Sequence, residues 1–350
     1  MSDGQSPKPV VIDNVKPSPE QLRKAYELAL KLWELAPWDM PMGENQLLVI
    51  KRANGRKSVL SVMGEYGEHR AVAIYPRVSS YCLISAIDPY DNLSLQDAFF
   101  SIRQTQVAFV KAANLLNGER AAIKASGVKF PRGVNPSLLS YIPGYDSERM
   151  GANELAEAMD AIQVFLDFFK THSAEDINLI DQEGDLVSVW YEAPDGTWTF
   201  GEEEFSPNPD TIINVSADLL DKVAKLPVNK KFRLEIGALP IPCGKSDSGH
   251  HLMGRLMIAV DGETQYALGT DILVPPEGRE FDWARAVEFV LKVIVNCGCK
   301  PGTLGVLGRL LEGTLYGLCS MELNGTMLIP DSECDAVRDV YEFSMRRLGF

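Results

Sequence analysis

The chain has 350 residues, of which 45% are hydrophobic and 23% are charged, and this ordinary globular usage is typical of about two domains. No hydrophobic stretch has the length of a membrane span, and the polar, proline-rich N-terminus lacks the apolar region of a signal peptide. The composition therefore argues against a membrane protein and predicts a cytoplasmic one.

The net charge of −14 is concentrated in the middle of the chain. Residues 148–222 contain 3 Lys and Arg and 18 Asp and Glu, a balance of −15, which leaves 31 basic and 30 acidic residues elsewhere, a balance of +1. An acidic surface repels phosphate backbones, so the sequence argues against nucleic acid as a partner. A protein partner and a small ligand are both compatible with it.

Six cysteines are scattered through a chain that has no export signal, which predicts reduced thiols rather than disulfides. They are Cys82, Cys243, Cys297, Cys299, Cys319 and Cys334. Cys297 and Cys299 are closer in sequence than the cysteine pairs of zinc sites, and Cys243 with His250-His251 does not have zinc-site spacing either. We therefore expect no metal and no other cofactor.

The N-terminal part predicts a helix followed by strands. Residues 1–17 are polar and proline-rich, as in a flexible tail. A capping box at Ser18 and Gln21 begins a helix that ends before Pro37. A strand over Gln46–Arg52 and a tight hairpin turn follow.

Two apolar runs, Ser58–Met63 and Ala71–Tyr75, predict adjacent strands joined by a glycine-containing turn. The turn carries Glu65, Glu68 and His69. A carboxylate beside an imidazole can work as an acid and a base. The same side chains also stabilise turns by hydrogen bonding, so a functional and a structural role are both open.

The middle of the chain predicts helices, a loop and a hairpin. Ser94 caps a helix whose apolar spacing continues to Asn117-Gly118. Residues 127–147 contain several prolines and glycines and are predicted to form a loop. The further elements are a helix over Asn153–Lys170, a hairpin of Leu186–Tyr191 and Thr197–Phe200, and a short helix over Ala217–Lys225.

From Lys231 the order of predicted elements is β-β-β-α-β-α-β-α. The short turns between the first three strands predict consecutive antiparallel neighbours, and the helix after the third strand implies a right-handed crossover and parallel pairing of the third and fourth strands. The elements are strands Phe232–Leu239, Gly254–Val260 and Thr264–Val274, a helix from Asp282 to Val295, a strand at Thr303–Leu307, a helix over Arg309–Leu318, a strand at Thr326–Ile329 and a helix from Asp331 to Arg346.

These elements predict an α+β or α/β protein of two domains. The N-terminal domain, residues 18–150, is expected to contain an antiparallel sheet with helices. Residues 151–229 form an acidic region of helix and hairpin, and residues 230–350 form a C-terminal domain with a mixed sheet.

The N-terminal half resembles a bacterial protein family of unknown function. The matching motifs are Leu35-Ala36-Pro37-Trp38, the Ser61–Tyr75 stretch with Gly67-Glu68-His69, and Tyr141-Ile142-Pro143-Gly144-Tyr145. The C-terminal half resembles the partner domain of the same family through Leu256–Asp261, Leu268-Gly269 and Cys299-Lys300-Pro301. The resemblance implies two domains over most of the chain, and it carries no established activity.

The C-terminal half is also similar to the RNase H-like core of integrases and transposases, through its order of elements and its Asp-Gly-Glu-Thr turn. That core binds two metal ions with an acid in its first strand and another at the end of its fourth. The resemblance places these positions near Glu235 and Gly308, while Asp261 belongs to a turn. Because glycine has no side-chain ligand, the resemblance implies an RNase H-like fold with a degenerate metal site.

The sequence contains no complete set of catalytic residues, which favours a non-catalytic binding or interaction module. The alternative is a hydrolase or nuclease-like enzyme that uses the Glu65, Glu68 and His69 turn or a divergent RNase H-like site. No catalytic residue is assigned. The candidate binding residues are Trp38, Glu65, Glu68, His69 and Tyr145, with the polar turn expected to lie near the chain corner at Trp38.

Overall fold

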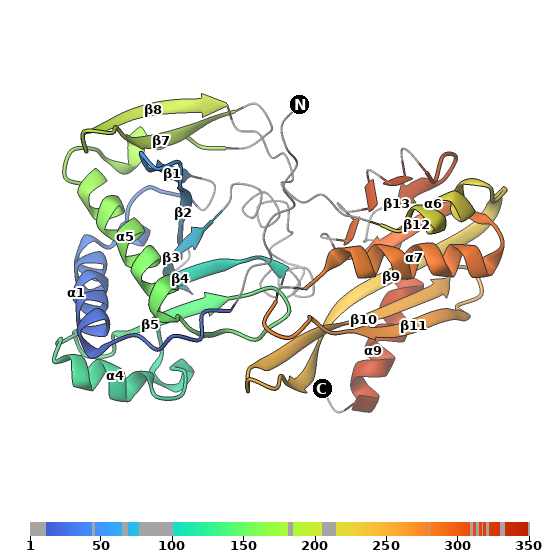
Figure 1. The fold of residues 1–350 in the computed structure, drawn as a ribbon, viewed down its shortest axis with the longest axis horizontal. Helices are drawn as coiled ribbons and strands as arrows, with labels where there is room; N and C mark the ends of the chain where they lie inside the picture. Colours follow the sequence, from blue (N-terminus) through green and yellow to red (C-terminus); the bar gives the residue numbers. More distant parts are fainter. Residues whose placement is uncertain are drawn as a thin grey trace.

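Two β-sheets organise the molecule, one in each half of the chain (Figure 1). The structure is a computed structural model that describes residues 12–43, 46–64, 69–76, 101–180, 185–204, 215–279, 281–308, 311–312, 315–316, 318–319, 322–329 and 333–348. Glu65, Glu68 and the predicted cap Ser94 lie outside these residues. Within the described ranges, no helix has the length and apolar character needed to cross a membrane.

The N-terminal sheet has eight strands in the order β6-β5-β4-β3-β2-β1-β7-β8. The strands from residues 18–150 are antiparallel neighbours, as the sequence predicts, whereas β7 pairs with β1 in parallel and thereby brings the hairpin of the acidic region into the same sheet. The strands are β1 (Leu47–Lys51), β2 (Lys57–Met63), β3 (Arg70–Tyr75), β4 (Gln104–Val110), β5 (Asn135–Tyr141), β6 (Glu148–Arg149), β7 (Leu186–Glu192) and β8 (Trp198–Glu204).

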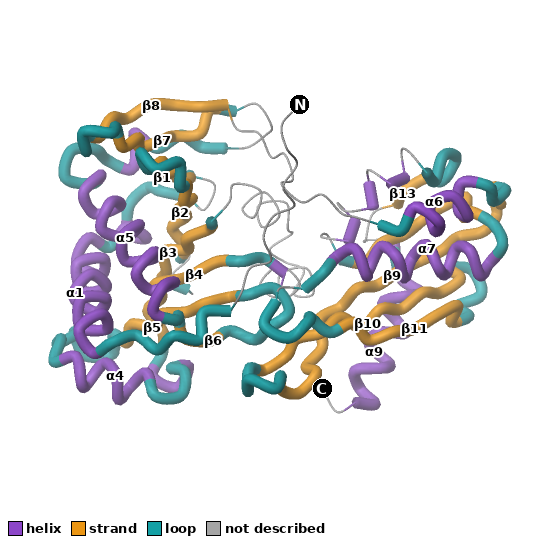
Figure 2. The backbone as a smooth tube through the Cα atoms, viewed as in Figure 1, coloured by secondary structure: helices purple, strands orange, loops and turns teal. Residues whose placement is uncertain are grey.

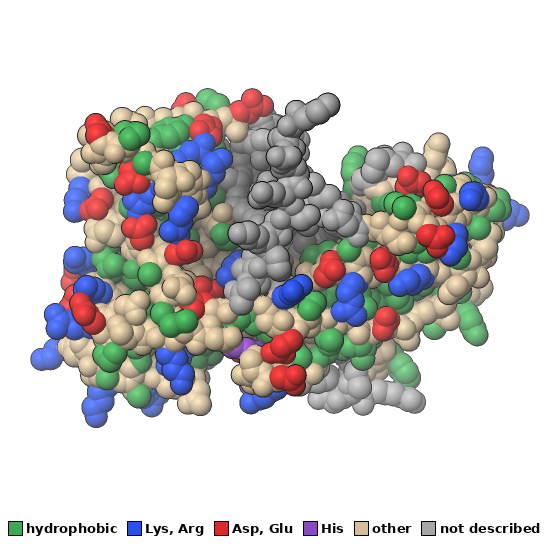
Figure 3. All heavy atoms as spheres, viewed as in Figure 1, with side chains coloured by type: hydrophobic (Ala, Val, Ile, Leu, Met, Phe, Trp, Pro, Cys, Tyr) green, Lys and Arg blue, Asp and Glu red, His purple; other side chains and the backbone are tan. Residues whose placement is uncertain are grey.

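This pairing places acidic residues of the middle region beside basic residues of the N-terminal region. Lys51 pairs with Glu203, and Arg52 pairs with Asp160 and, at 3.5 Å, with Glu192. In Figure 3 acidic and basic side chains are interspersed over the visible surface of both halves. The charge of −15 counted along residues 148–222 is therefore partly neutralised by folding.

One face of the N-terminal sheet is covered by helices α1 (Pro19–Leu35), α4 (Glu119–Ser126) and α5 (Ala152–Phe168) (Figures 1 and 2). The predicted capping box begins α1, because Ser18 Oγ accepts from Gln21 N and Gln21 Oε1 accepts from Ser18 N. Short 3-10 helices at Pro37–Asp39, Ala112–Asn114 and Ala174–Asp176 connect elements of this half.

The strands carry apolar residues on both faces, as expected for strands that are buried on both sides. The face toward the helices, which we call the first face, is mainly apolar, with Ser140 and Ser188 as buried polar residues. It includes Leu48, Ile50, Leu60, Val62, Val72, Ile74 and Val107. The opposite face, the second face, includes Leu47, Val49, Val59, Ala73 and Tyr75, and a second group of Ala71, Ala108 and Leu139.

Two predictions for the middle of the chain are wrong. The helix predicted from Ser94 to Gly118 contains β4 and a 3-10 turn in its described part, and the loop predicted over residues 127–147 contains β5. The apolar residues Ile102, Phe109 and Ala113 happen to have helical spacing. The alternation of Gln104–Val110 fits a strand equally well, and pairing with β3 and β5 on both sides decides the outcome.

The C-terminal sheet has five strands in the order β11-β10-β9-β12-β13. The first three are consecutive antiparallel neighbours, which confirms that prediction. The parallel partner of β12 is β9 and not β11, because the crossover through α7 carries the chain past β10 to the far side of β9. The strands are β9 (Val228–Lys245), β10 (His251–Asp261), β11 (Ala267–Leu273), β12 (Lys300–Leu307) and β13 (Met327–Ile329).

Helices cover both faces of this sheet (Figure 1). On one face lie α6 (Ala217–Ala224) and α7 (Trp283–Cys297), which share one apolar core with β9, β10 and β12. On the other face lies α9 (Asp335–Leu348), which packs against Leu239, Ile258 and Leu307. Asp282 accepts a hydrogen bond from Ala284 N and begins α7 as predicted.

Candidate functional site

The predicted site residues that the structure describes do not gather in one place. Trp38 is 4% exposed and packs in the core of the first face, with its ring centroid 5.6 Å from that of Trp33 and 5.2 Å from that of Phe109. Its role is packing against these aromatic rings rather than contact with a ligand.

His69 lies just before β3, and its Nε2 is 3.1 Å from Gln106 Oε1 on the second face. The next residue, Arg70, instead reaches toward the corner at Trp38, where its guanidinium is 3.6 Å from Asp39. Because successive strand residues point to opposite faces, the side chain of His69 lies on the second face, whereas that of Arg70 lies on the side of the core that contains Trp38. Gly64 has a φ of +109°, and a Cβ there would be 2.9 Å from His69 O, so this end of the predicted glycine-containing turn requires glycine.

Tyr145 lies in the loop between β5 and β6, where the parts of the chain built on the N-terminal and C-terminal sheets meet; these two parts are called the two domains below. Its hydroxyl donates to Pro276 O at 3.1 Å, and the neighbouring Pro143 O accepts from Phe281 N at 3.0 Å. Burial, followed by the negative charge of Glu277, raises the pKa of Tyr145, so its hydroxyl stays protonated as a donor. The motif that carried the family resemblance is thus part of the domain junction.

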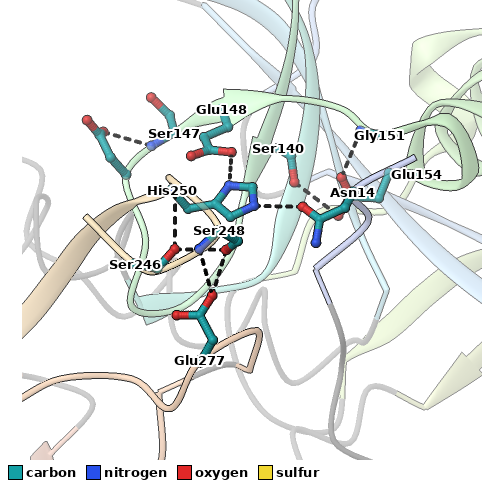
Figure 4. A network of polar contacts seen from close by, with 11 residues as sticks. Asn14, Ser140, Ser147, Glu148, Gly151, Glu154, Ser246, Ser248, His250 and Glu277 are labelled. Carbon is teal, nitrogen blue, oxygen red and sulfur yellow. Dashed lines mark hydrogen bonds and ion pairs between the residues drawn. The ribbon is translucent and has the colours of Figure 1, made fainter. Parts of the chain in front are cut away.

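His250 is the centre of a polar network at this junction (Figure 4). Its Nδ1 is 2.6 Å from Glu148 Oε2, its Nε2 is 2.7 Å from Asn14 Oδ1, and its ring stands edge-on to Tyr145. Both ring nitrogens of His250 therefore lie within hydrogen-bond distance of side-chain oxygens. Asn14 comes from the segment before α1, Glu148 from β6 and Tyr145 from the β5–β6 loop, whereas His250 lies in the β9–β10 hairpin, so His250 links the two domains.

The segment before α1 contacts both domains, although the sequence predicts a flexible tail for residues 1–17. Ile12 N donates to Gly278 O at 3.4 Å in the C-terminal half. Asp13 Oδ2 accepts from Asn153 N at 2.5 Å and from Glu154 N at 3.1 Å, so this carboxylate caps the start of α5. The segment therefore fixes Asn14 next to His250.

Glu154 forms the adjoining part of the network in Figure 4. Its Oε1 accepts from Ser140 Oγ and from Arg103 Nη2, both at 3.0 Å. Burial raises the pKa of Glu154 and the positive charge of Arg103 opposes this shift. Ser140 and His250 also line a cavity of about 10 Å³, which is room for one water molecule.

The second face of the N-terminal sheet carries a different polar group. Gln106 Nε2 donates to Gln104 Oε1 at 3.0 Å, and His69 Nε2 donates to Gln106 Oε1, which makes a chain of three side chains. Gln106 and Gln104 are 0% and 1% exposed. Nearby, the buried Arg255 of β10 donates to Ser101 Oγ and so makes a further contact between the domains.

The C-terminal sheet contains a buried carboxylate, Glu235, on its central strand. Its Oε1 accepts from Arg233 Nε at 2.8 Å and its Oε2 accepts from Val337 N at 3.0 Å in the first turn of α9. A Cβ at Gly305, the neighbour of Glu235 on β12, would lie 3.2 Å from Glu235 Cγ. Glu235 thus joins β9 to α9 in a tightly packed position.

The thiols and histidines do not form a metal centre in the part of the chain that the structure describes. His250 is bonded to Glu148, while Cys243 Sγ donates to Ile241 O at 3.5 Å. Burial raises the pKa of Cys243, and burial followed by the charges of Cys299 and Asp261 raises the pKa of Cys297. These thiols stay protonated at neutral pH, whereas metal binding needs thiolates.

A family model described as Domain of unknown function (DUF7309) matches residues 23–187. The match runs from α1 into β7 and agrees with the predicted resemblance of the N-terminal half to a family of unknown function. No curated protein matches the chain, and no solved structure does either.

Sequence reasoning missed the residues that make the junction and the glutamine chain. His250 was considered only as a metal ligand, and its partners Asn14 and Glu148 lie far from it in sequence. Gln104 and Gln106 had a usable signal, because two glutamines at alternate positions of an otherwise apolar strand must share one face. The incorrect helix prediction hid that pattern.

Proposed function

We propose that the protein is a non-catalytic binding or interaction module built from two domains. The observation that carries this proposal is the bonding of His250, whose two ring nitrogens contact Glu148 and Asn14. An imidazole that acts as a general acid or base needs one nitrogen within reach of the substrate. Here His250 and Glu148, a pair that resembles an acid–base dyad, connect the two domains.

The nature of the junction supports a binding role. The contacts that cross it include backbone hydrogen bonds, such as Asp146 N to His251 O at 3.0 Å and Met253 N to Gly144 O at 2.9 Å, together with the polar network of His250. Polar interfaces between domains are typical of proteins whose domains move relative to one another, and such proteins often close on a ligand.

A thermal-shift screen of the full chain against metal ions, nucleotides, amino acids and carboxylic acids tests the binding proposal, because a ligand that binds only the folded state raises Tm. Esterase and phosphatase assays with chromogenic substrates test the non-catalytic part. We expect a stabilising ligand and no turnover. Turnover that is lost in His250→Ala and kept in His251→Ala would contradict the proposal, since only His250 contacts Glu148.

A second candidate is an RNase H-like enzyme, as the resemblance of the C-terminal half implies. The order β11-β10-β9-β12-β13 supports the RNase H-like assignment. The three antiparallel strands β9, β10 and β11 come first in the chain, and β12 and β13 then pair in parallel on the free side of β9. Fold alone does not determine activity.

The residues at the corresponding metal positions do not fit two metal ions. Both oxygens of Glu235 are bonded to Arg233 and Val337, and Gly308 follows β12 where the similar core has an acid. We therefore expect no cleavage of DNA or RNA with magnesium or manganese. Metal-dependent cleavage that is lost in Glu235→Gln would favour the enzyme.

A further inference from the structure

The amide nitrogen of Gln104 is a buried donor without an acceptor. Gln104 is 1% exposed, and its Nε2 has no hydrogen-bond partner among the residues that the structure describes. Most buried polar side-chain atoms in folded proteins are paired, and an unpaired one is costly enough to need an explanation. A role in binding is one such explanation, because a site kept ready for a ligand carries polar groups that only the ligand completes.

The direction of the glutamine chain decides what kind of ligand group fits. His69 Nε2 donates to Gln106 Oε1, and Gln106 Nε2 donates to Gln104 Oε1. The carbonyl of Gln104 is therefore occupied, and its two N–H groups form the open end. Each bond of such a chain polarises the next, so a histidine that donates at the far end makes the Gln104 N–H groups stronger donors.

The surroundings of Gln104 are also rich in donors. Tyr141 lies opposite Gln104 in the pairing of β4 with β5. Burial, followed by the negative charge of Asp146, raises the pKa of Tyr141 to about 12, so its hydroxyl stays protonated. The guanidinium of Arg255 contacts Ser101, three residues before Gln104. A permanent positive charge in this region favours an anionic acceptor over a neutral one.

Small residues adjoin Gln106 on the second face. Ala73 of β3 lies opposite Gln106, Ala108 is the next residue of β4 on the same face, and both are buried.

We propose that Gln104 marks a binding site on the second face of the N-terminal sheet for a small molecule that presents a carboxylate. The carboxylate oxygens accept from the two Nε2 hydrogens of Gln104, and His69 supports this through Gln106. The inference rests on the proposal that the protein binds a ligand and adds the position and the chemical class of that ligand. It does not depend on the network around His250.

The first test compares the ligand-free stability of two glutamine variants on the same strand. Gln104→Leu removes two unpaired N–H groups but also the acceptor of Gln106 Nε2, so it should lower Tm by no more than about 2 °C, whereas Gln106→Leu breaks two hydrogen bonds and should lower it by about 4 °C. A loss in Gln104→Leu as large as that in Gln106→Leu would overturn the proposal, because it would mean that the Gln104 N–H groups are already satisfied within the folded chain or by a fixed water.

The second test uses acetate as the probe, with chloride at equal ionic strength and acetamide as controls. Acetate should raise the Tm of the parent in a saturable way and should leave Gln104→Leu unchanged. Equal shifts in both proteins, or a shift with acetamide alone, would overturn the carboxylate site. A different ligand that stabilises the parent and Gln104→Leu equally would leave the binding module standing and reject this site.

If Gln104→Leu does not fold, the parent alone decides the question. In a ¹⁵N-labelled full chain, the side-chain amide resonances of Gln104 should move on titration with acetate, while those of Gln163 on α5 should not. Gln163 is the matched control because its Nε2 already donates to Asp167 at 3.1 Å. Unmoved Gln104 resonances at saturating acetate would contradict the site.

Discussion

The two faces of the N-terminal sheet are made by the same strands but differ in how their buried polar side chains are hydrogen-bonded. On the first face, α1, α4 and α5 cover side chains such as Leu60, Val72 and Val107. The buried serines of this face, Ser140 and Ser188, are hydrogen-bonded to Glu154 and to Asn178 N. On the second face, the same strands present small residues and the polar chain of His69, Gln106 and Gln104. Both glutamines are as deeply buried as the apolar residues opposite them.

The difference separates the parts of the sheet that need only burial from the part that needs a specific chemical partner. An apolar face is stabilised by contact with almost any well-fitting apolar surface. A buried amide is stabilised only if its hydrogen bonds are made, and Gln104 Nε2 makes none within the described part of the chain. Places where a sequence breaks the local rule for a buried strand are where function is expected.

Truncation on the first face should give the largest loss of stability. Phe165 of α5 is fully buried, with its ring 4.9 Å from that of Phe169. Phe165→Ala should lower the free energy of unfolding by about 3–5 kcal/mol, since it removes apolar burial and leaves a cavity. Urea denaturation followed by tryptophan fluorescence measures this loss. A loss below about 1 kcal/mol would mean that the first face is not a tightly packed core.

Breaking the glutamine chain in its middle should have the second largest effect. Gln106→Leu removes the acceptor of His69 and the donor to Gln104, and we expect a loss of about 2 kcal/mol in the free energy of unfolding. Gln163→Leu, on the outer part of α5, should stay within about 0.5 kcal/mol of the parent. Equal stabilities of the two variants in urea titrations would show that the hydrogen bonds of Gln106 contribute no more to stability than those of Gln163.

The domain junction offers a polar group whose partners are all present, in contrast to Gln104. His250→Ala removes the bonds to Glu148 and Asn14 and should cost about 1–2 kcal/mol of unfolding free energy. The adjacent His251 is exposed, so His251→Ala should change stability by less than about 0.5 kcal/mol. Thermal denaturation of the pair measures the difference, and a His250→Ala protein as stable as His251→Ala would show that the network does not hold the domains together.

The smallest expected effect is a pH dependence from Glu154. Because burial raises the pKa of Glu154 in the folded state, the folded protein binds this proton at higher pH than the unfolded chain does. The charged carboxylate therefore costs stability at neutral pH, and the cost disappears as pH falls through the folded pKa. Between about pH 7 and pH 5 the parent should gain stability relative to Glu154→Gln. A constant difference in denaturation midpoints over this range would contradict the shift.

The sequence predicts the elements whose signals are local. The capping box at Ser18, the helix start at Asp282 and the antiparallel order of β9, β10 and β11 depend on short motifs and turns, and the structure confirms them. The sequence predicts helix for β4 because the apolar residues Ile102, Phe109 and Ala113 have helical spacing, and only its two neighbours in the sheet fix its conformation.

The candidate site could be predicted only in part. His69 was identified from its place in a turn between strands, but its partner Gln106 lies 37 residues away and depends on the pairing of β3 with β4. The network of His250 joins residues separated by up to 236 positions. Such contacts follow from sheet order and domain packing, which local patterns do not encode.

The most direct test of the central claim is a high-resolution crystal structure of the full chain grown in acetate. The deciding observation is the identity of the atoms within about 3.2 Å of Gln104 Nε2. Our account predicts a carboxylate oxygen of acetate there, with the bonds from Gln106 and His69 retained. An oxygen of the chain itself, or a single water in place of acetate, would contradict it.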